Sequence, residues 1–320
     1  MIKNLFNLVL NEMLKIYKRK STWMMYLFLV VFIAGGAILA INTQSSYSEN
    51  WKVELEEENK TLVQEIEEFS GMPGMQTIRD VNQESIMTNQ FYLENDMKPM
   101  NYGAWQFVLD NADMLIIVSL FSIIIGATII SDEYKWGTIK LLMVRPYSRS
   151  TILAVKYLAI LIFTFFTLLF MQLASFITGA FLLGIEGINP EIVAFRNGDV
   201  GQLNAIKMII SNYSYNLIPL IMMATLAFTI STIFKNSTIA ISLAIVLMLS
   251  GNMIVTFFAD QSFTKYLLFA HTDLQQYQNN SMLLEDTSLS FSITILIIYY
   301  VIFLISSFIV FNRKDIIVNE

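Results

Sequence analysis

The stretch SDEYKWGTIKLLMVRPYSRS, residues 131–150, decides the fold because it joins two long apolar segments. Residues 114–130 precede it and residues 158–185 follow it, and neither segment contains Asp, Glu, Lys, Arg or His. A helix needs about 20 apolar residues to cross the roughly 30 Å hydrocarbon core of a bilayer. Both segments are therefore predicted membrane spans, and the stretch between them is a polar connection at one membrane surface.

Four further segments without charged residues meet the same length criterion, namely residues 23–41, 217–234, 238–258 and 289–311. The composition agrees, because 55% of the residues are hydrophobic and 14% are charged, whereas soluble domains carry about 25% charged residues. The sequence thus predicts an all-α integral membrane protein with six transmembrane helices. No small-residue cleavage pattern follows residues 23–41, so we expect this segment to remain as an anchor.

The distribution of basic residues predicts the orientation of the spans. Thirteen Lys and Arg residues lie on one side of the membrane. They occur before the first span, between spans two and three, between spans four and five, and after the sixth span. The opposite side has three in its two short loops, and the four in its long loop are discounted because long loops translocate largely regardless of charge. We therefore expect a multi-pass protein of the cell membrane with both termini cytoplasmic, including the tail at residues 312–320.

Residues 1–22 are predicted to form an amphipathic helix at the cytoplasmic interface. Its apolar stripe consists of Ile2, Leu5, Phe6, Val9, Leu10, Met13 and Tyr17. Such a helix lies with its apolar side toward the acyl chains and its basic side toward lipid phosphate. Two interpretations stay open, a helix that serves only the topology and a lever joined to the first span.

Residues 42–113 contain 14 of the 26 carboxylates and are predicted to form an acidic extracellular domain. A heptad-like stripe indicates a helix that ends at the SGMPGM sequence of residues 70–75, because Gly and Pro break helices. The stripe consists of Trp51, Leu55, Leu62, Ile66 and Phe69. The domain is either a solvated helix packed on its own loop or a funnel that attracts cationic ligands.

Several classes of activity are excluded by what the spans lack. Without an ionisable group at depth, the spans have no residue that could bind a coupling proton or ion by titration. Gln172 and Asn252 are the strongest polar groups at depth, and they either bond neighbouring helices or line a translocation path. HExxH and GxSxG motifs are absent, as is cysteine, and the single histidine, His271, is interpreted as an ordinary loop residue rather than a metal ligand. We therefore expect a protein without catalytic activity.

Energy for transport would have to come from another polypeptide. The chain has no GxxxxGK[ST] sequence and no Gly-Lys dipeptide, so it lacks a phosphate-binding loop. We expect it to bind no cofactor, while ATP and Mg would be bound by a partner ATPase. The connection at residues 131–156 is the predicted contact point. Ser131 is predicted to cap a new amphipathic helix there, with Asp132 and Glu133 in its first turn and Pro146 at its end.

The longer sequence SDEYKWGTIKLLMVRPYSRSTILAVKYLA, residues 131–159, resembles the signature loop of ABC-2 type permeases, the membrane subunits of ATP-binding-cassette exporters. The matching positions are Glu133, Gly137 with Thr138, the apolar residues 139–144, Pro146 with Ser148 and Arg149, and Lys156. One departure is Ala154-Val155 before Lys156, where many relatives carry Gly immediately before the Lys. This departure affects the expected local packing.

The resemblance implies a coupling helix that docks on a separate ABC-type ATP-binding subunit. The implied docking residues are Asp132, Glu133, Lys135, Gly137, Thr138, Arg145, Pro146 and Arg149. Glu133 and Arg145 are expected to make charged contacts with the ATPase, and Gly137 to allow close approach of the backbone. Further implied partners are membrane lipid and a second permease subunit, either another copy or a paralogue, whereas nucleic acid is not expected.

The expected function is export of an amphipathic or antimicrobial peptide or a lipid-like compound, although the family also contains members assigned to sodium export and to metal-centre maturation. The alternative is a non-transporting membrane sensor or signalling partner that uses the acidic extracellular domain as its receptor.

Overall fold

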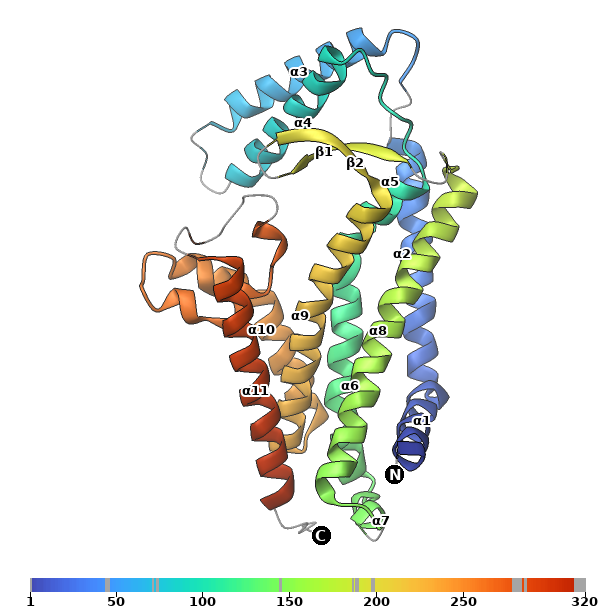
Figure 1. Ribbon diagram of the computed structural model, residues 1–320, viewed down its shortest axis with the longest axis vertical. Helices are drawn as coiled ribbons and strands as arrows, with labels where there is room; N and C mark the ends of the chain where they lie inside the picture. Colours follow the sequence, from blue (N-terminus) through green and yellow to red (C-terminus); the bar gives the residue numbers. More distant parts are fainter. Residues whose placement is uncertain are drawn as a thin grey trace.

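The computed structural model describes residues 2–43, 47–70, 72, 75–143, 146–185, 187, 190–196, 199–277, 284 and 287–313. Within these residues, six helical segments are long and apolar enough to cross a membrane, as predicted. They run side by side along the long axis (Figure 1). The segments are α2 (Lys20–Thr43), α5 (Ala104–Asp110) continued by η1 (Asn111–Met114) and α6 (Leu115–Lys135), α8 (Arg149–Leu182), α9 (Ala205–Phe234), α10 (Ser237–Phe257) and α11 (Leu289–Arg313).

The remaining elements lie at the two ends of this bundle (Figure 1). One end, called the α1 end, has α1 (Ile2–Lys18) and α7 (Ile139–Met143). The other, called the hairpin end, has α3 (Trp51–Glu68), α4 (Gln76–Glu94), β1 (Glu191–Arg196) and β2 (Asp199–Asn204). The short 3-10 helices η2 (Thr264–Tyr266), η3 (Leu268–His271) and η4 (Gln275–Tyr277) follow α10.

Helices α6 and α9 form the centre of the bundle and approach each other closely. The Cβ that an alanine would place at Gly126 of α6 would lie 2.8 Å from the carbonyl oxygen of Ala224 in α9. In the segment that contains α5 and α6, 72% of the most apolar window is buried, compared with 22% for α2 and α10 and 17% for α11. The apolar surfaces of these three peripheral helices therefore remain available to lipid.

The structure extends or shifts several predicted spans. Helices α8 and α9 begin before the apolar segments at residues 158–185 and 217–234, because both helices have polar or amphipathic first turns. The third span ends near Leu183 rather than at residue 185, since Gly184 has a φ of +89°. Residues 104–110, which we predicted in the extracellular domain, form α5, where Ala104 and Phe107 are buried against Gly179 of α8.

The elements at the hairpin end confirm one prediction and correct another. The predicted acidic helix is α3, in which Trp51 and Leu55 are buried and which packs against α4. The expectation of an all-α protein was wrong in one detail, because β1 and β2 pair as an antiparallel hairpin with Glu191 opposite Asn204. The Asn-Gly dipeptide at residues 197–198 is the sequence signal that could have predicted it, since this dipeptide favours two-residue hairpin turns.

Candidate functional site

Helix α6 continues beyond the predicted second span and carries the first polar residues of the connection. Ser131 does not cap a new helix, because it lies within α6 and its hydroxyl donates to the carbonyl of Ala127 at 2.7 Å. Asp132 and Glu133 consequently lie in the last turns of α6 rather than in the first turn of another helix. The predicted coupling helix is reduced to α7, five residues long.

Gly137 terminates α6 through its backbone conformation and not through close packing. Its φ of +67° is in the left-handed region, which glycine adopts without steric cost. A Cβ built at this position would have no atom within 4 Å. The described residues thus leave space around Gly137, and close approach of the ATPase backbone to it stays a prediction.

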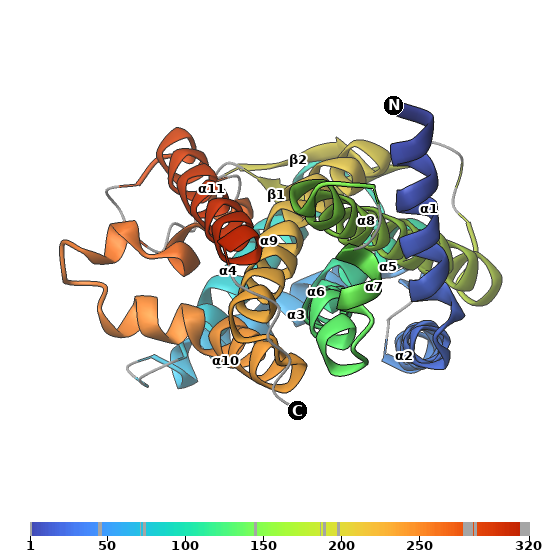
Figure 2. The same cartoon turned by 90° about the horizontal axis from the view of Figure 1, so that it is seen from below.

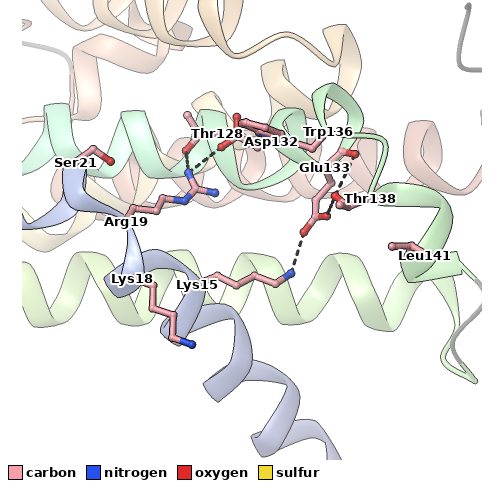
Figure 3. Close-up of a pocket in the computed structure, with 10 residues that line it drawn as sticks. All are labelled: Lys15, Lys18, Arg19, Ser21, Thr128, Asp132, Glu133, Trp136, Thr138 and Leu141. Atoms are coloured by element: carbon pink, nitrogen blue, oxygen red, sulfur yellow. Dashed lines mark hydrogen bonds and ion pairs between the residues drawn. The ribbon is translucent and has the colours of Figure 1, made fainter.

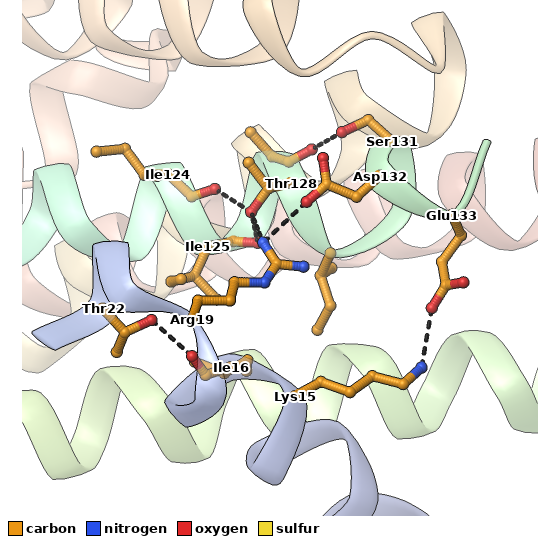
Figure 4. Close-up of polar contacts among 12 residues, drawn as sticks. Lys15, Ile16, Arg19, Thr22, Ile124, Ile125, Thr128, Ser131, Asp132 and Glu133 are labelled. Carbon is orange, nitrogen blue, oxygen red and sulfur yellow. Dashed lines mark hydrogen bonds and ion pairs between the residues drawn. The ribbon is translucent and has the colours of Figure 1, made fainter. Parts of the chain in front are cut away.

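A group of four charged side chains, three buried and one exposed, joins α1, α6 and α8. We call it the ionic cluster: Glu12, Glu133 and Lys156, which are buried, and Lys15, which is exposed. The Nζ of Lys156 donates to Glu12 Oε2 and Glu133 Oε1, both at 2.8 Å, and to the carbonyl of Ile129 at 3.2 Å. Lys15 donates to Glu12 Oε1 at 2.8 Å and to Glu133 Oε1 at 3.0 Å. Figures 3 and 4 show Lys15 of α1 reaching Glu133. Three helices that are distant in sequence therefore share one charged centre.

The cluster is electrically balanced, with two ammonium groups and two carboxylates. Lys156 is only 2% exposed, and a buried charge is destabilising unless it is paired and hydrogen-bonded. Burial tends to lower the pKa of Lys15, but hydrogen bonds and attraction to Glu12 and Glu133 outweigh this effect and raise the pKa above its usual value. Lys15 is therefore cationic at neutral pH.

Glu133 makes contacts within the chain, and its predicted contact with the ATPase stays a prediction. The residue is 9% exposed, one carboxylate oxygen accepts from both lysines, and the other accepts from the hydroxyl of Thr138. Both carboxylate oxygens of Glu133 are therefore hydrogen-bonded within the chain. Thr138, also a predicted docking residue, is half-buried and holds the same carboxylate.

A second polar contact joins the turn between α1 and α2 to α6. Arg19 donates through Nη1 to Thr128 Oγ1 at 3.1 Å and pairs with Asp132 Oδ2 at 2.9 Å (Figure 4). Thr22 donates to the carbonyl of Ile16 at 2.6 Å. Asp132, a predicted docking residue, is thus paired within the chain, and the turn is fixed from both sides.

Helix α1 is amphipathic as predicted, and it lies across the end of the bundle, whereas α2 is seen end-on (Figure 2). The stripe splits into two parts. Val9 is buried, as are Glu12 and Ile16, which the predicted stripe did not contain. The other part is exposed and available to a membrane interface, and it consists of Leu5, Phe6 and Leu10. Leu14, outside the predicted stripe, is exposed as well. The contacts of Glu12 and Lys15 with α6 and α8 favour the interpretation of α1 as a lever.

The turn between α6 and α8 exposes apolar and basic side chains, and we call it the α6–α7 surface: Lys135, Trp136, Lys140, Leu141 and Pro146. Trp136 is 74% exposed and Leu141 is 70% exposed, whereas Ile139 between them is buried and anchors α7. Lys135, Lys140 and Pro146 are also exposed. Trp136 and Leu141 border a groove of about 820 Å³ between α1 and α6 (Figure 3).

The remaining predicted docking residues are Arg145 and Arg149. Arg145 lies outside the described residues. Arg149 begins α8, and its Nη1 donates to the carbonyl of Asn312 in α11 at 3.3 Å. Arg149 therefore links two spans at the α1 end.

The two predicted path residues are not brought together. Gln172 is half-buried on α8, whereas Asn252 lies on α10 and lines a separate cavity of about 220 Å³ near the hairpin end. Gln172 does not line that cavity. Of the two residues, Asn252 is therefore the one beside this cavity.

His271 is a buried structural residue of η3. It is fully buried, and its ring nitrogens bond Ser292 Oγ at 2.6 Å and the carbonyl of Lys265 at 2.8 Å. Across the described part of the chain, no group of three His, Cys, Asp or Glu side chains is placed to hold a metal ion. His271 instead links the loop after α10 to α11.

We expect this histidine to make stability depend on pH. Burial lowers the pKa of His271 below its usual 6.5, so the unfolded chain binds a proton more readily than the folded one. The contribution of His271 to the free energy of unfolding is complete above about pH 6.5, and it falls as the pH drops toward the folded-state pKa. The unfolding temperature of the purified protein should therefore decrease from about pH 7 to about pH 5 more steeply than that of His271→Gln. Equal slopes for both proteins would contradict this prediction.

Sequence reasoning missed two members of the ionic cluster. Glu12 was not identified, although it is the single carboxylate of a helix whose other charged residues are basic and it falls between apolar positions 9 and 13. Lys15 lies off the predicted apolar stripe and was expected on the basic side of α1, toward lipid phosphate. A lone Glu on the apolar side of an otherwise basic helix is the signal that indicates a buried cationic partner.

Comparisons with known proteins give relatives but no activity. The family described as protein of unknown function (DUF2705) matches residues 75–317. The Bacillus subtilis (strain 168) protein named uncharacterized protein YhcI is 35% identical over 318 residues, which cover 98% of this chain and 99% of the relative. The uncharacterized membrane protein YdbK of the same strain is 28% identical over 204 residues, 63% of this chain and 78% of the relative. Together with the six apolar helical segments, this likeness indicates a membrane protein.

Proposed function

Because the chain belongs to the DUF2705 family, whose description assigns no activity, we propose its function from the α1 end of the bundle. The protein is the permease subunit of an ABC-2 type transporter and exports an amphipathic peptide or lipid-like compound. A separate ATP-binding subunit supplies the energy. A second permease subunit, identical or paralogous, completes the transporter.

The observation that carries this proposal is the exposure of Trp136 and Leu141 on the α6–α7 surface. Tryptophan is enriched among the residues that dominate binding at protein interfaces. These two side chains are flanked by Lys135 and Lys140, so the surface combines an apolar centre with a basic rim. This pattern favours a partner protein with an apolar pocket and acidic edges.

The ionic cluster supports a mechanical role for this surface. The turn is covalently joined to α6 and α8, and Lys156 and Glu133 connect the same two helices through a buried ion pair of 2.8 Å. Lys15 and Glu12 add α1 to this unit. Movement of the turn by a partner would therefore displace α1, α6 and α8 together and shift the balance between inward-open and outward-open arrangements.

The proposed orientation and the proposed cargo both rest on the distribution of charged residues in the sequence. The excess of Lys and Arg favours the α1 end as the cytoplasmic side of the cell membrane. The apolar cores of the spans have no ionisable residue, which suits an amphipathic cargo and energy input from outside the bilayer.

Substitution of Leu141 by aspartate tests the proposal. We expect the wild-type protein, purified from its native host, to retain an ATPase with a phosphate-binding loop. The Leu141→Asp variant should lose at least about tenfold in affinity for that ATPase, because it places a charge in the centre of a desolvated interface. The measurement is a binding titration with the purified ATPase, combined with ATP hydrolysis by the reconstituted complex.

The matched control is Val53→Asp, which introduces the same charge at an exposed apolar position of α3 at the opposite end. It should leave ATPase binding unchanged. Unchanged binding by Leu141→Asp would overturn the assignment of the docking surface. A wild-type protein that neither binds nor stimulates an ATPase, but responds to external ligands, would favour the sensor alternative.

A further inference from the structure

A second cavity lies among α6, α9, α10 and the loop that contains η3, toward the hairpin end of the bundle. Its volume is about 220 Å³. Residues from four separate parts of the chain line it, including Ser119 of α6, Asn216 of α9, Asn252 of α10 and Asp273 of the loop. The cavity is therefore distant in the fold from the ionic cluster and the α6–α7 surface.

One wall of the cavity is apolar and adaptable. Met223 of α9 and Met248 of α10 line it, and methionine side chains adjust easily to ligands of different shape. Phe269 closes the wall, and this position depends on Gly251, where an added Cβ would lie 2.3 Å from ring atoms of Phe269. The absence of a side chain at Gly251 thus allows the phenylalanine to border the cavity.

Other lining residues have hydrogen-bonding groups that the protein itself leaves unused. Ser119 is 8% exposed, yet its hydroxyl has no hydrogen bond with any described residue. Because Ser119 lines the cavity, its hydroxyl is available to bond a ligand or solvent there. The Nδ2 of Asn216 donates to the carbonyl of Asn212 at 3.0 Å, which leaves its Oδ1 as an acceptor.

Asp273 supplies a further acceptor. It accepts through Oδ1 from the backbone N–H of Gln275 at 2.9 Å, and its second oxygen is not bonded to any described residue. The carboxylate and the Oδ1 of Asn216 can therefore both accept hydrogen bonds from a ligand.

The charge of the cavity selects the sign of its ligand. Asp273 is the single ionisable residue among the lining residues, which include no Lys, Arg or His. An anionic ligand would meet this carboxylate without a compensating cation, whereas an ammonium or guanidinium group would pair with it. Ser119 and Asn216 can accept the remaining N–H groups of such a head.

We propose that this cavity binds an amphipathic organic cation, with its charged head between Asp273, Asn216 and Ser119 and its apolar part against Met223 and Met248. Binding itself does not depend on the exporter proposal, and only its interpretation as a cargo site rests on that proposal. A volume of about 220 Å³ is below the range of about 300 to 1,000 Å³ that holds drug-sized ligands. The site therefore holds a small amine or one side chain of a basic peptide.

The test uses hexylammonium as the probe and the full-length protein in nanodiscs of zwitterionic phosphatidylcholine, without any ATPase. Methionine methyl groups are labelled with carbon-13, and binding is followed by NMR. The signals of Met223 and Met248 should shift in a saturable manner. Met24, which is 64% exposed on α2, reports partition of the probe into lipid and should not show saturable shifts.

Asp273→Asn should weaken the binding of hexylammonium about fivefold or more, because it removes the charge that pairs with the head. The control is Asp260→Asn, an exposed aspartate of the same loop that does not line the cavity, and it should leave the affinity unchanged. Hexanol and hexanoate should bind more weakly than hexylammonium, in that order.

Three results would overturn the site: no saturable shift at Met223 or Met248, equal affinity for hexanoate, or unchanged affinity in a folded Asp273→Asn protein. None of them bears on docking at Leu141, which is measured with ATPase present. Loss of ATPase binding in the Leu141→Asp variant would in turn leave hexylammonium binding intact, so the two proposals fail separately.

Discussion

Replacement of Lys156 by methionine should destabilise the folded protein by about 3–5 kcal/mol, the range measured when one partner of a buried ion pair is removed. Lys156 is 2% exposed and contacts both carboxylates of the ionic cluster at 2.8 Å. Methionine fills a similar volume but carries no charge. Glu12 and Glu133 would then share Lys15 as their remaining cation in the cluster, and their mutual repulsion would no longer be balanced.

The measurement is the free energy of unfolding of the purified protein in a mild detergent. Lys140→Met is the matched control, because it makes the same substitution at an exposed lysine of α7, and it should change stability by less than about 0.5 kcal/mol. The triple variant Glu12→Gln, Glu133→Gln, Lys156→Met should recover part of the loss, since it removes the stranded charges. A single Lys156→Met variant as stable as wild type would show that the cluster does not hold the helices together.

Gly126→Leu should destabilise the protein by about 3 kcal/mol, the upper end of the usual range for overpacking in a core. The Cβ would lie 2.8 Å from the carbonyl oxygen of Ala224 and 3.6 Å from the Cβ of Ala227. The first of these atoms belongs to the backbone of α9, so a rotamer change cannot relieve the contact. Helices α6 and α9 would have to separate, which would loosen the centre of the bundle.

Gly35→Leu provides the control for Gly126→Leu. Gly35 is an exposed glycine of α2, and an added Cβ there would meet no atom within 4 Å. This substitution should be neutral or stabilising, because leucine has a higher helix propensity than glycine by up to about 1 kcal/mol. Similar unfolding temperatures for the two variants would contradict the close approach of α6 to α9.

The helices could be predicted from sequence more completely than their contacts. Charge-free segments such as residues 114–130 identified the six spans because the bilayer imposes both length and polarity on a helix. The helix ends were less certain, since Ala104 and Arg149 lie in helical turns that are not continuously apolar. The hairpin of β1 and β2 was missed because its strands alternate weakly between buried and exposed positions.

The sequence indicated where the polar connection lies in the chain, but not which side chains contact one another there. The stretch at residues 131–150 correctly indicated a polar connection, and the exposure of Trp136 could not be derived from its sequence. Glu133 was expected on the surface, and it is buried because Lys156, 23 positions later, lies on the neighbouring helix. Glu12 is 144 positions from Lys156, so only the packing of α1 on α8 brings them together. The orientation of the chain and its partners remain predictions.

The balanced charge of the ionic cluster has a consequence for the influence of voltage on the protein. A membrane potential does work only on charge that moves through it, about 2.3 kcal/mol per elementary charge for each 100 mV. Glu12, Lys15, Glu133 and Lys156 together carry no net charge, so displacement of the cluster as one body transfers none across the bilayer. The membrane potential therefore favours neither position of these four side chains through their own charge.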